Sequence, residues 1–313
     1  MKKHMSLSDS LLSLSGLTRQ SLFIIALLLL TACSSAPKRS MQVSTIYSAA
    51  SEMIESANGC ILTGDYEKAG FFLSSAENQA MSIDNYDLLS AAALARCSLA
   101  LSKNPPEIEN AQLYVDYARG LVNNCANPKK QAALVTLSQV RVKSAQAGSD
   151  QASNIKTSDL FASLDSIKKD LKGDAYYESQ IIQVEGDLYK LDKNYNQADK
   201  SYSAAAKAFT DNRYLSEIGI CWYKAAQARS LAGNKDGALE AMEQAIFYDR
   251  AAENSLALGS DYYAVGLILL KGNPGSGEKE RARKAFNHSA EIYASVNAEE
   301  LAKRSRTAAS QIE

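Results

Sequence analysis

Residues suited to nucleophilic or metal chemistry are few in this 313-residue chain. Its two histidines are His4 and His288, and neither has a second histidine or a cysteine at the spacing of a metal site. No Gly-x-Ser-x-Gly sequence is present, and no cysteine can be matched convincingly with a histidine. We therefore expect His288 to be a solvent-facing helix residue, and the sequence predicts no catalytic residue, metal ligand or cofactor.

A glycine-rich run from Gly272 to Lys279 has the composition of a phosphate-binding loop. Such a loop follows a strand and needs lysine directly after its last glycine, to reach the phosphates. Here Glu278 stands in that position and would repel a phosphate, and no strand is predicted before it. The run is therefore expected to be a long turn between two helices.

The N-terminal segment has the features of an export signal. Lys2, Lys3 and Arg19 supply positive charge, and an apolar run from Leu22 to Leu30 follows. A membrane-spanning helix needs about 20 apolar residues, roughly twice the length of this run. The segment is therefore set apart from the folded domain.

The apolar run ends in Leu30, Thr31, Ala32 and Cys33, which resemble the lipobox of bacterial lipoproteins. The resemblance implies that signal peptidase recognises the first three residues and cuts before Cys33. It also implies diacylation of the Cys33 thiol and a third chain, such as palmitate, on the new amine; two or more chains anchor a protein stably. Ser34 follows, which in enteric-type bacteria resembles the signal for the outer membrane. The implied segments are a signal peptide over residues 1–32 and a lipidated tether over residues 33–41.

The elements that follow repeat with a period of about forty residues. Each copy is a polar turn followed by a small, a large and a second small residue at offsets of four and three, which places all three on one helical face. The small residues let a neighbouring helix approach closely. The copies are Ala69/Leu73/Ala76, Ala111/Val115/Ala118, Ala198/Tyr202/Ala205, Ala238/Met242/Ala245 and Ala282/Phe286/Ser289.

Another helix is predicted before each turn. One of these helices carries Gly186 and Tyr189, and another carries Trp222. The combined pattern resembles the tetratricopeptide repeat (TPR), W-x2-L-G-x2-Y followed by A-x3-F-x2-A. No proline closes the second helices and the period exceeds 34, so the repeats are degenerate. A further unit is inferred from a helix over residues 129–147 and a second helix with Leu160, Leu164 and Ile167 buried. Ser158 or Asp159 is expected near the N-cap of that second helix.

The resemblance implies an all-α fold, a TPR-like α-solenoid of about six antiparallel helix pairs. The repeat domain would cover residues 42–296, and a polar helix over residues 297–313 would cap its open end. An irregular helical bundle is the alternative fold.

Four cysteines lie within this repeat domain. Cys60, Cys97 and Cys221 fall on predicted helices at buried positions, where cysteine serves as a small apolar residue. Cys125 follows a helix end and is the best candidate for a reactive or paired thiol. The sequence leaves open whether any of these cysteines form a disulfide. Cys60 with Cys97 would be the geometrically easiest pair, because both lie on the first helices of adjacent units.

In TPR proteins the first helices of the units line a concave groove. Amide, aromatic and charged side chains occupy the corresponding positions here, and such a mixture suits an extended peptide or a polar ligand. The lysine and asparagine pattern that binds a C-terminal carboxylate is not reproduced. The candidate groove residues are Gln183, Asp187, Lys190, Tyr223, Gln227, Tyr263 and Leu267.

The chain has a formal net charge of -1, which argues against nucleic-acid binding. Together with the lipobox, the repeats and the lack of catalytic residues, this leads us to expect a non-enzymatic, membrane-anchored periplasmic scaffold. It would bind an envelope protein or peptide, as an accessory to envelope assembly, secretion or pilus formation. The alternative is a ligand-binding or transport-accessory lipoprotein that partners a periplasmic solute-binding protein. A deep apolar cavity would favour that alternative, and an open polar groove would favour docking. An enzyme acting on envelope polymers would need carboxylates converging in a cleft.

Overall fold

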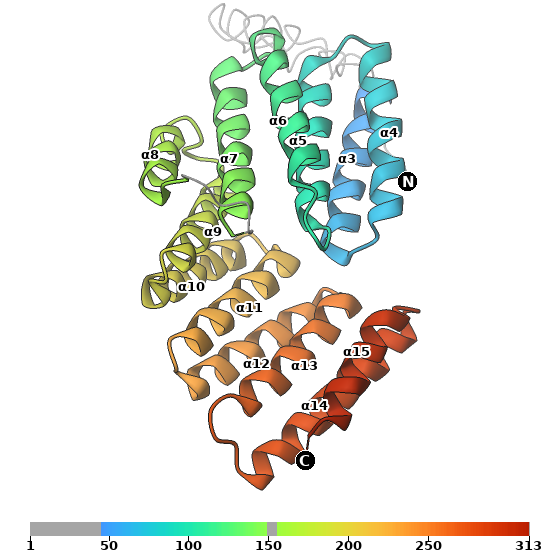
Figure 1. Ribbon diagram of the computed structural model, residues 1–313. Helices are drawn as coiled ribbons and strands as arrows, with labels where there is room; N and C mark the ends of the chain where they lie inside the picture. The colour runs from blue at the N-terminus through green and yellow to red at the C-terminus, as the bar shows by residue number, and fades with distance from the viewer. Residues whose placement is uncertain (1–44, 149–154, 313) are drawn as a thin grey trace, which may run out of the picture. The chain divides into compact units, whose positions relative to one another are not determined.

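The computed structural model describes residues 45–148 and 155–312, and these residues form thirteen α-helices, turns and one 3-10 segment, η2 (Val122–Asn124), without a strand. Successive helices pack against each other (Figure 1). The predicted all-α solenoid is confirmed. The signal segment, Cys33 and the tether lie outside the described residues. Within the described part, no helix has the length and apolar character to cross a membrane.

Twelve helices form six pairs, and the last helix, α15 (Glu299–Ser310), packs on α14. The pairs are α3 (Thr45–Thr63) with α4 (Tyr66–Ser82), α5 (Tyr86–Ser102) with α6 (Ile108–Leu121), α7 (Pro128–Ala147) with α8 (Thr157–Ile167), α9 (Ala175–Leu191) with α10 (Tyr195–Asp211), α11 (Leu215–Leu231) with α12 (Lys235–Ala251) and α13 (Ser255–Leu270) with α14 (Ser276–Ser295).

The small-large-small triplets form the centre of each of their pairs, and every one of their fifteen side chains is at most 1% exposed. Glycines on the facing helices make room for the large members. A Cβ built on Gly186 would lie 2.6 Å from the ring of Tyr202, and one on Gly266 would lie 2.6 Å from the ring of Phe286. The spacing that predicted the repeats therefore corresponds to direct packing between the two helices of a unit.

Several of the turns between helices share one local conformation. A residue with positive φ is followed by an N-cap residue whose side chain accepts a hydrogen bond from the backbone N–H three positions on. Lys193 with φ 58° precedes the cap Asn194, and Gly233 with φ 84° precedes the cap Asn234. These turns are short, so consecutive helices run antiparallel.

The start of α8 has no side-chain cap. The helix begins at Thr157, and its N-cap residue is Lys156, which makes no side-chain capping bond. The Thr157 hydroxyl donates to Oδ1 of Asp192, 2.6 Å away, so a contact with the end of α9 fixes this helix start. Ser158 and Asp159 lie near this N-cap, as expected, but in the first turn of the helix, and neither is the cap itself.

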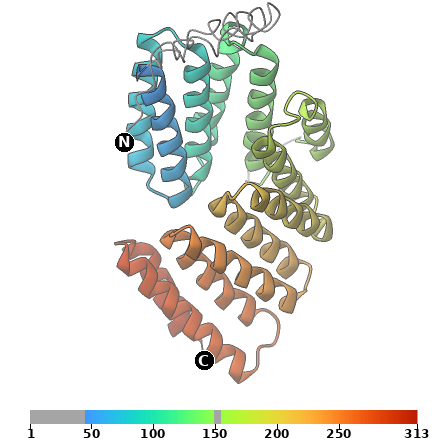
Figure 2. The same cartoon turned by 180° about the vertical axis from the view of Figure 1, so that it is seen from behind.

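The array of helix pairs also makes a contact that is not between neighbours. Helix α13 of the sixth unit touches α3 of the first (Figures 1 and 2). In a simple solenoid each unit contacts only the units beside it. The described part of the chain thus turns back on itself.

Candidate functional site

The seven candidate groove residues all lie on first helices of units. Six are half-buried, and Leu267 is 51% exposed. We call the surface that these seven residues form the helix-A face. On α9 they are Gln183, Asp187 and Lys190, on α11 Tyr223 and Gln227, and on α13 Tyr263 and Leu267.

Asp187 is the centre of a polar joint between three helices. The Tyr202 hydroxyl of α10 donates to its Oδ1 at 2.7 Å, and Nζ of Lys224 on α11 lies 2.9 Å from both carboxylate oxygens. Burial alone would raise the pKa of Asp187, but the pKa lies below its ordinary value because Lys224 and Tyr202 stabilise the carboxylate. Asp187 is therefore engaged inside the protein, which makes it a positioning residue of the helix-A face.

Lys190 stands one turn from this joint on the same helix. Burial lowers the pKa of Lys190 and the nearby Lys224 ammonium lowers it further, while Asp187 opposes both. One carboxylate thus lies close to two lysines. The local excess of positive charge suits an acceptor-rich group of a partner.

Tyr223 and Gln227 lie one turn apart on α11, close enough for the Gln227 amide to lower the pKa of the Tyr223 phenol. Burial raises the pKa of the Tyr223 phenol, so it stays neutral and can act as a hydrogen-bond donor or acceptor. The field of Arg304 reaches this phenol from α15. Arg304 of the last helix is therefore close enough to act on a residue of the helix-A face.

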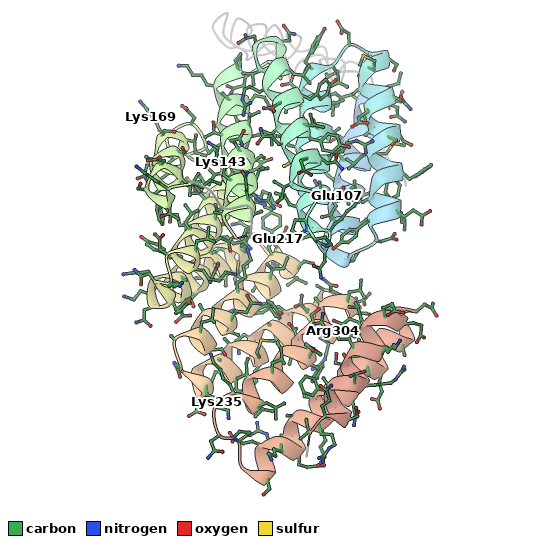
Figure 3. The ribbon with its side chains drawn as sticks, in the orientation of Figure 1. Glu107, Lys143, Lys169, Glu217, Lys235 and Arg304 are labelled. Carbon is green, nitrogen blue, oxygen red and sulfur yellow. The ribbon has the colours of Figure 1, made fainter. Side chains whose placement is uncertain are left out.

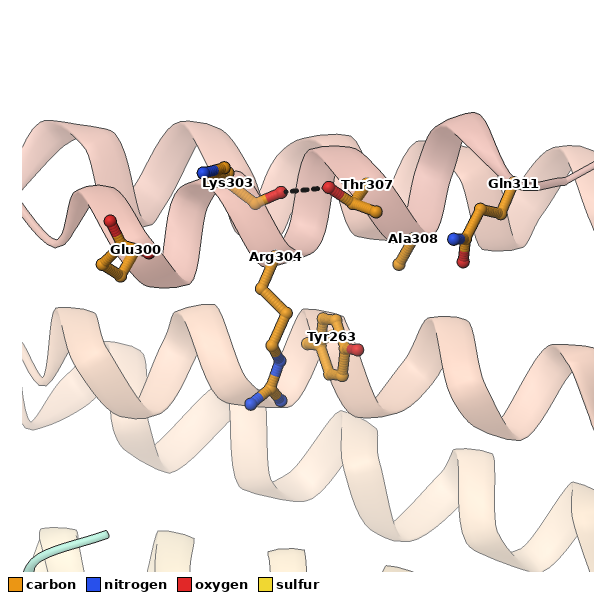
Figure 4. Close-up of a pocket in the computed structure, with 7 residues that line it drawn as sticks. All are labelled: Tyr263, Glu300, Lys303, Arg304, Thr307, Ala308 and Gln311. Atoms are coloured by element: carbon orange, nitrogen blue, oxygen red, sulfur yellow. Dashed lines mark hydrogen bonds between the residues drawn. The ribbon is translucent and has the colours of Figure 1, made fainter.

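A polar pocket of about 340 Å³ lies between α13 and α15 (Figure 4). The guanidinium of Arg304 stacks on the ring of Tyr263 with its carbon 4.3 Å from the ring centroid. Such stacking leaves the guanidinium edge available for hydrogen bonds. The lining residues are Tyr263, Glu300, Lys303, Arg304, Thr307, Ala308 and Gln311.

Three residues beside the candidate positions were not predicted from the sequence: Lys224, Arg304 and Glu217. Lys224 completes the joint at Asp187, and Arg304 lies on a helix outside the repeats, so no repeat position points to it. Glu217 lies at the start of α11 (Figure 3); burial raises the pKa of its carboxyl, and the nearby Tyr176 of α9 lowers it. Lys224 directly follows the candidate groove residue Tyr223, and this position is the one sequence feature that could have pointed to it. The repeat pattern points to neither Arg304 nor Glu217.

Two buried aspartates join the fifth and sixth units. Asp249 at the end of α12 and Asp261 on α13 are each 1% exposed, and they lie close enough for each carboxyl to shift the pKa of the other. Gly219 of α11 leaves the space that the Asp249 carboxyl fills. Asp249 Oδ1 and Asp261 Oδ2 have no hydrogen-bond partner. Burial raises the pKa of both groups, and the Asp249 carboxylate raises that of Asp261 further.

All four cysteines of the repeat domain are free thiols. Cys97 and Cys221 are buried as predicted, whereas Cys60 is half-buried. Cys125 is also buried, and its thiol lies 3.4 Å from the Leu121 carbonyl oxygen. Burial and the nearby Asp87 raise the pKa of Cys125, and the thiol forms no disulfide here; its reactivity stays a prediction.

The other positions considered for chemistry have structural explanations. His288 is exposed on α14 beside Glu291, as expected. Glu278 accepts a hydrogen bond from the Gly275 backbone and pairs with Lys235 at 2.7 Å, so it organises the start of α14. Across residues 45–148 and 155–312, no three histidine, cysteine or acidic side chains are grouped to hold a metal ion.

Comparison of the chain with protein-family models and with curated proteins finds no match.

Proposed function

We propose that this chain is a lipid-anchored protein of the bacterial cell envelope whose TPR-like repeats dock another envelope protein or peptide. The observation that carries the docking proposal is the helix-A face. Its amide, aromatic and charged side chains are half-buried on the first helices of successive units, so they are held in position and partly exposed. Lys190, Tyr223, Gln227 and Tyr263 are the proposed contact residues.

The lining of the pocket beside Tyr263 supports docking of a polar segment at this position. Five of its seven lining residues carry charged or polar side chains other than the phenol of Tyr263. An apolar small molecule gains little from such a lining, whereas a polar peptide segment can exchange its water for hydrogen bonds there. We therefore propose that Arg304 and Tyr263 together bind the partner at this end of the face.

The anchor is proposed from the lipobox and the short chain that follows it. Between Cys33 and the start of α3 at Thr45 the chain can span at most about 40 Å when fully extended. The repeats would thus act within that distance of the bilayer. Replacing Cys33 by Ser should release the protein from the membrane fraction into the soluble periplasmic fraction. Persistence of the Cys33→Ser variant in membranes would contradict lipid anchoring.

Docking can be tested by placing a photo-crosslinking amino acid at position 223 or 263 in cells. The same reagent at 117 or 247 is the matched control, because Tyr117 and Phe247 are exposed aromatic residues on second helices. We expect a defined crosslinked product from 223 and 263 only, and its loss in an Arg304→Ala background for position 263. Equal products at all four positions would contradict the helix-A face as the docking surface.

A further inference from the structure

The first and sixth units meet where α3 ends and α13 begins. Nδ2 of Asn254 donates to the Leu62 carbonyl oxygen at 3.1 Å, across 192 positions of sequence. Beside this bond, a Cβ built on Gly64 would lie 2.6 Å from Cδ1 of Leu256. One hydrogen bond and one apolar contact therefore join two units that are far apart in the array.

Asn254 differs from the other N-cap asparagines in its burial. Asn194 and Asn234 cap their helices and are exposed, whereas Asn254 is 1% exposed. Its Oδ1 accepts from the Ala257 N–H at 3.1 Å, as a cap does, and its amide nitrogen is used for the first unit. Both ends of the side chain thus have partners, which allows a polar group to be buried at this junction.

The two helix ends that meet are complementary. Leu62 lies in the last turn of α3, where carbonyls lack partners within the helix and carry the negative end of the helix dipole. Asn254 stands at the positive end of α13. The last turn of α3 contains no basic residue and the first turn of α13 no acidic one, so neither end is neutralised by its own helix. The contact between Asn254 and the Leu62 carbonyl brings these two ends together, so that the dipole of each helix compensates that of the other.

Gly64 permits the close approach. The same turn position before a helix holds Lys193, Arg213 and Glu253 with φ of 58°, 61° and 55°, so this backbone conformation accepts long side chains. At Gly64, with φ 79°, the space is taken by Leu256. A side chain here would displace the end of the Leu256 side chain, and a long one would extend between the two units.

We propose that this contact is a clasp that holds the array closed and opens to give a partner access to the helix-A face. The clasp is small compared with the packed interfaces within each unit, so it can open while the helix pairs stay folded. Its opening would widen the space in front of α9, α11 and α13. The role in access rests on the proposed docking function; the clasp itself does not.

The closing contact can be tested on the purified protein with Gly64→Lys as a wedge. Gly233→Lys is the matched control, because Gly233 has φ 84° in an equivalent turn and no atom within 4 Å of a built Cβ. We expect Gly64→Lys alone to increase the radius of gyration in small-angle scattering and to speed amide exchange severalfold at the end of α3 and the start of α13. Identical behaviour of the two variants would overturn the clasp.

A second pair of variants guards against a folding defect. Asn254→Asp keeps the oxygen that caps α13 but loses the donor to Leu62, and Asn234→Asp makes the same change where no such donor is used. Expansion in Asn254→Asp, with helical circular dichroism unchanged, supports the clasp; a size equal to that of Asn234→Asp contradicts it.

Access to the helix-A face can be measured without a partner. A bulky amine reagent should modify the half-buried Lys190 severalfold faster in Gly64→Lys than in the parent. Lys284, with its side chain 75% exposed, is the internal reference. An expanded array with unchanged Lys190 reactivity would overturn the gating role. Neither outcome depends on whether the proposed partner exists.

Discussion

At the scale of single residues, Asp249 and Asp261 stand out because their carboxyl groups face each other without a cation. Besides Asp249 on α12, the groups that interact with Asp261 from other helices are the phenols of Tyr223 on α11 and Tyr293 on α14, both uncharged at neutral pH. Arg304 on α15 acts on these phenols and is not among the groups that shift either aspartate. A shared proton is therefore the remaining way to satisfy the pair.

This arrangement predicts that stability falls as pH rises. The pKa of Asp261 in the folded chain is raised above its ordinary value of 3.8, so the folded state keeps a proton that the unfolded state releases. The stabilisation is complete below the ordinary pKa and is lost as pH rises through the folded pKa. Asp261→Asn removes this titration and keeps a donor for Asp249. We expect it to flatten the profile by up to about 1.4 kcal/mol per pH unit.

Urea unfolding from about pH 4 to about pH 9 measures this effect, since the window spans the ordinary and the raised values. Asp236→Asn is the control, because it removes an exposed carboxylate from α12, the helix that carries Asp249. A profile for Asp261→Asn as steep as that of the parent and the control would show that the pair does not hold the extra proton.

At the scale of the helices, the fit of a glycine to a large ring decides how the two helices of a unit pack. Gly186→Ala places a methyl group 2.6 Å from the buried Tyr202 ring and should destabilise the fold by about 1–3 kcal/mol. Gly59→Ala is the control in α3, where a Cβ meets no atom within 4 Å and should stabilise the helix by about 0.5–1 kcal/mol. Thermal or urea unfolding compares them; the same sign for both would contradict the proposed packing.

The same contacts explain how much the sequence predicted. Ala198, Tyr202 and Ala205 are spaced for one helical face, and their partner Gly186 lies in the adjacent helix, so local periodicity was sufficient to find the helix pairs. The joint between Asp187 and Lys224 and the stacking of Arg304 on Tyr263 connect different units. They depend on the rotation between units, which no short-range pattern specifies. The sequence could therefore place the candidate residues on the first helices of the units, but not show which of them are engaged internally; their role as a groove stays a prediction.

At the scale of the whole molecule, the array has one end that must be covered. Six units pack in series, and the sixth is covered by α15 through Ala302, Ser305 and Ala309, which are buried against it. The Ser289 hydroxyl lies 3.0 Å from that of Ser305 and donates to the Gly259 carbonyl. A solenoid needs such a polar-faced end helix, because the last repeat otherwise exposes the surface that a further repeat would cover.

Ending the chain after Asn297 should therefore do more than remove a tail. Without α15, Phe286 of the sixth-unit core loses the neighbouring Ala309, and Tyr263 loses Arg304. We expect stability to fall by about 2 kcal/mol or more and the shortened protein to self-associate through the exposed face of α14. Urea unfolding and light scattering measure the two effects. Arg306→Ala, which changes an exposed side chain of α15, should alter neither. A shortened chain that stays monomeric and as stable as the parent would mean that α15 is not the cap of the array, and its polar face would then be available for another role.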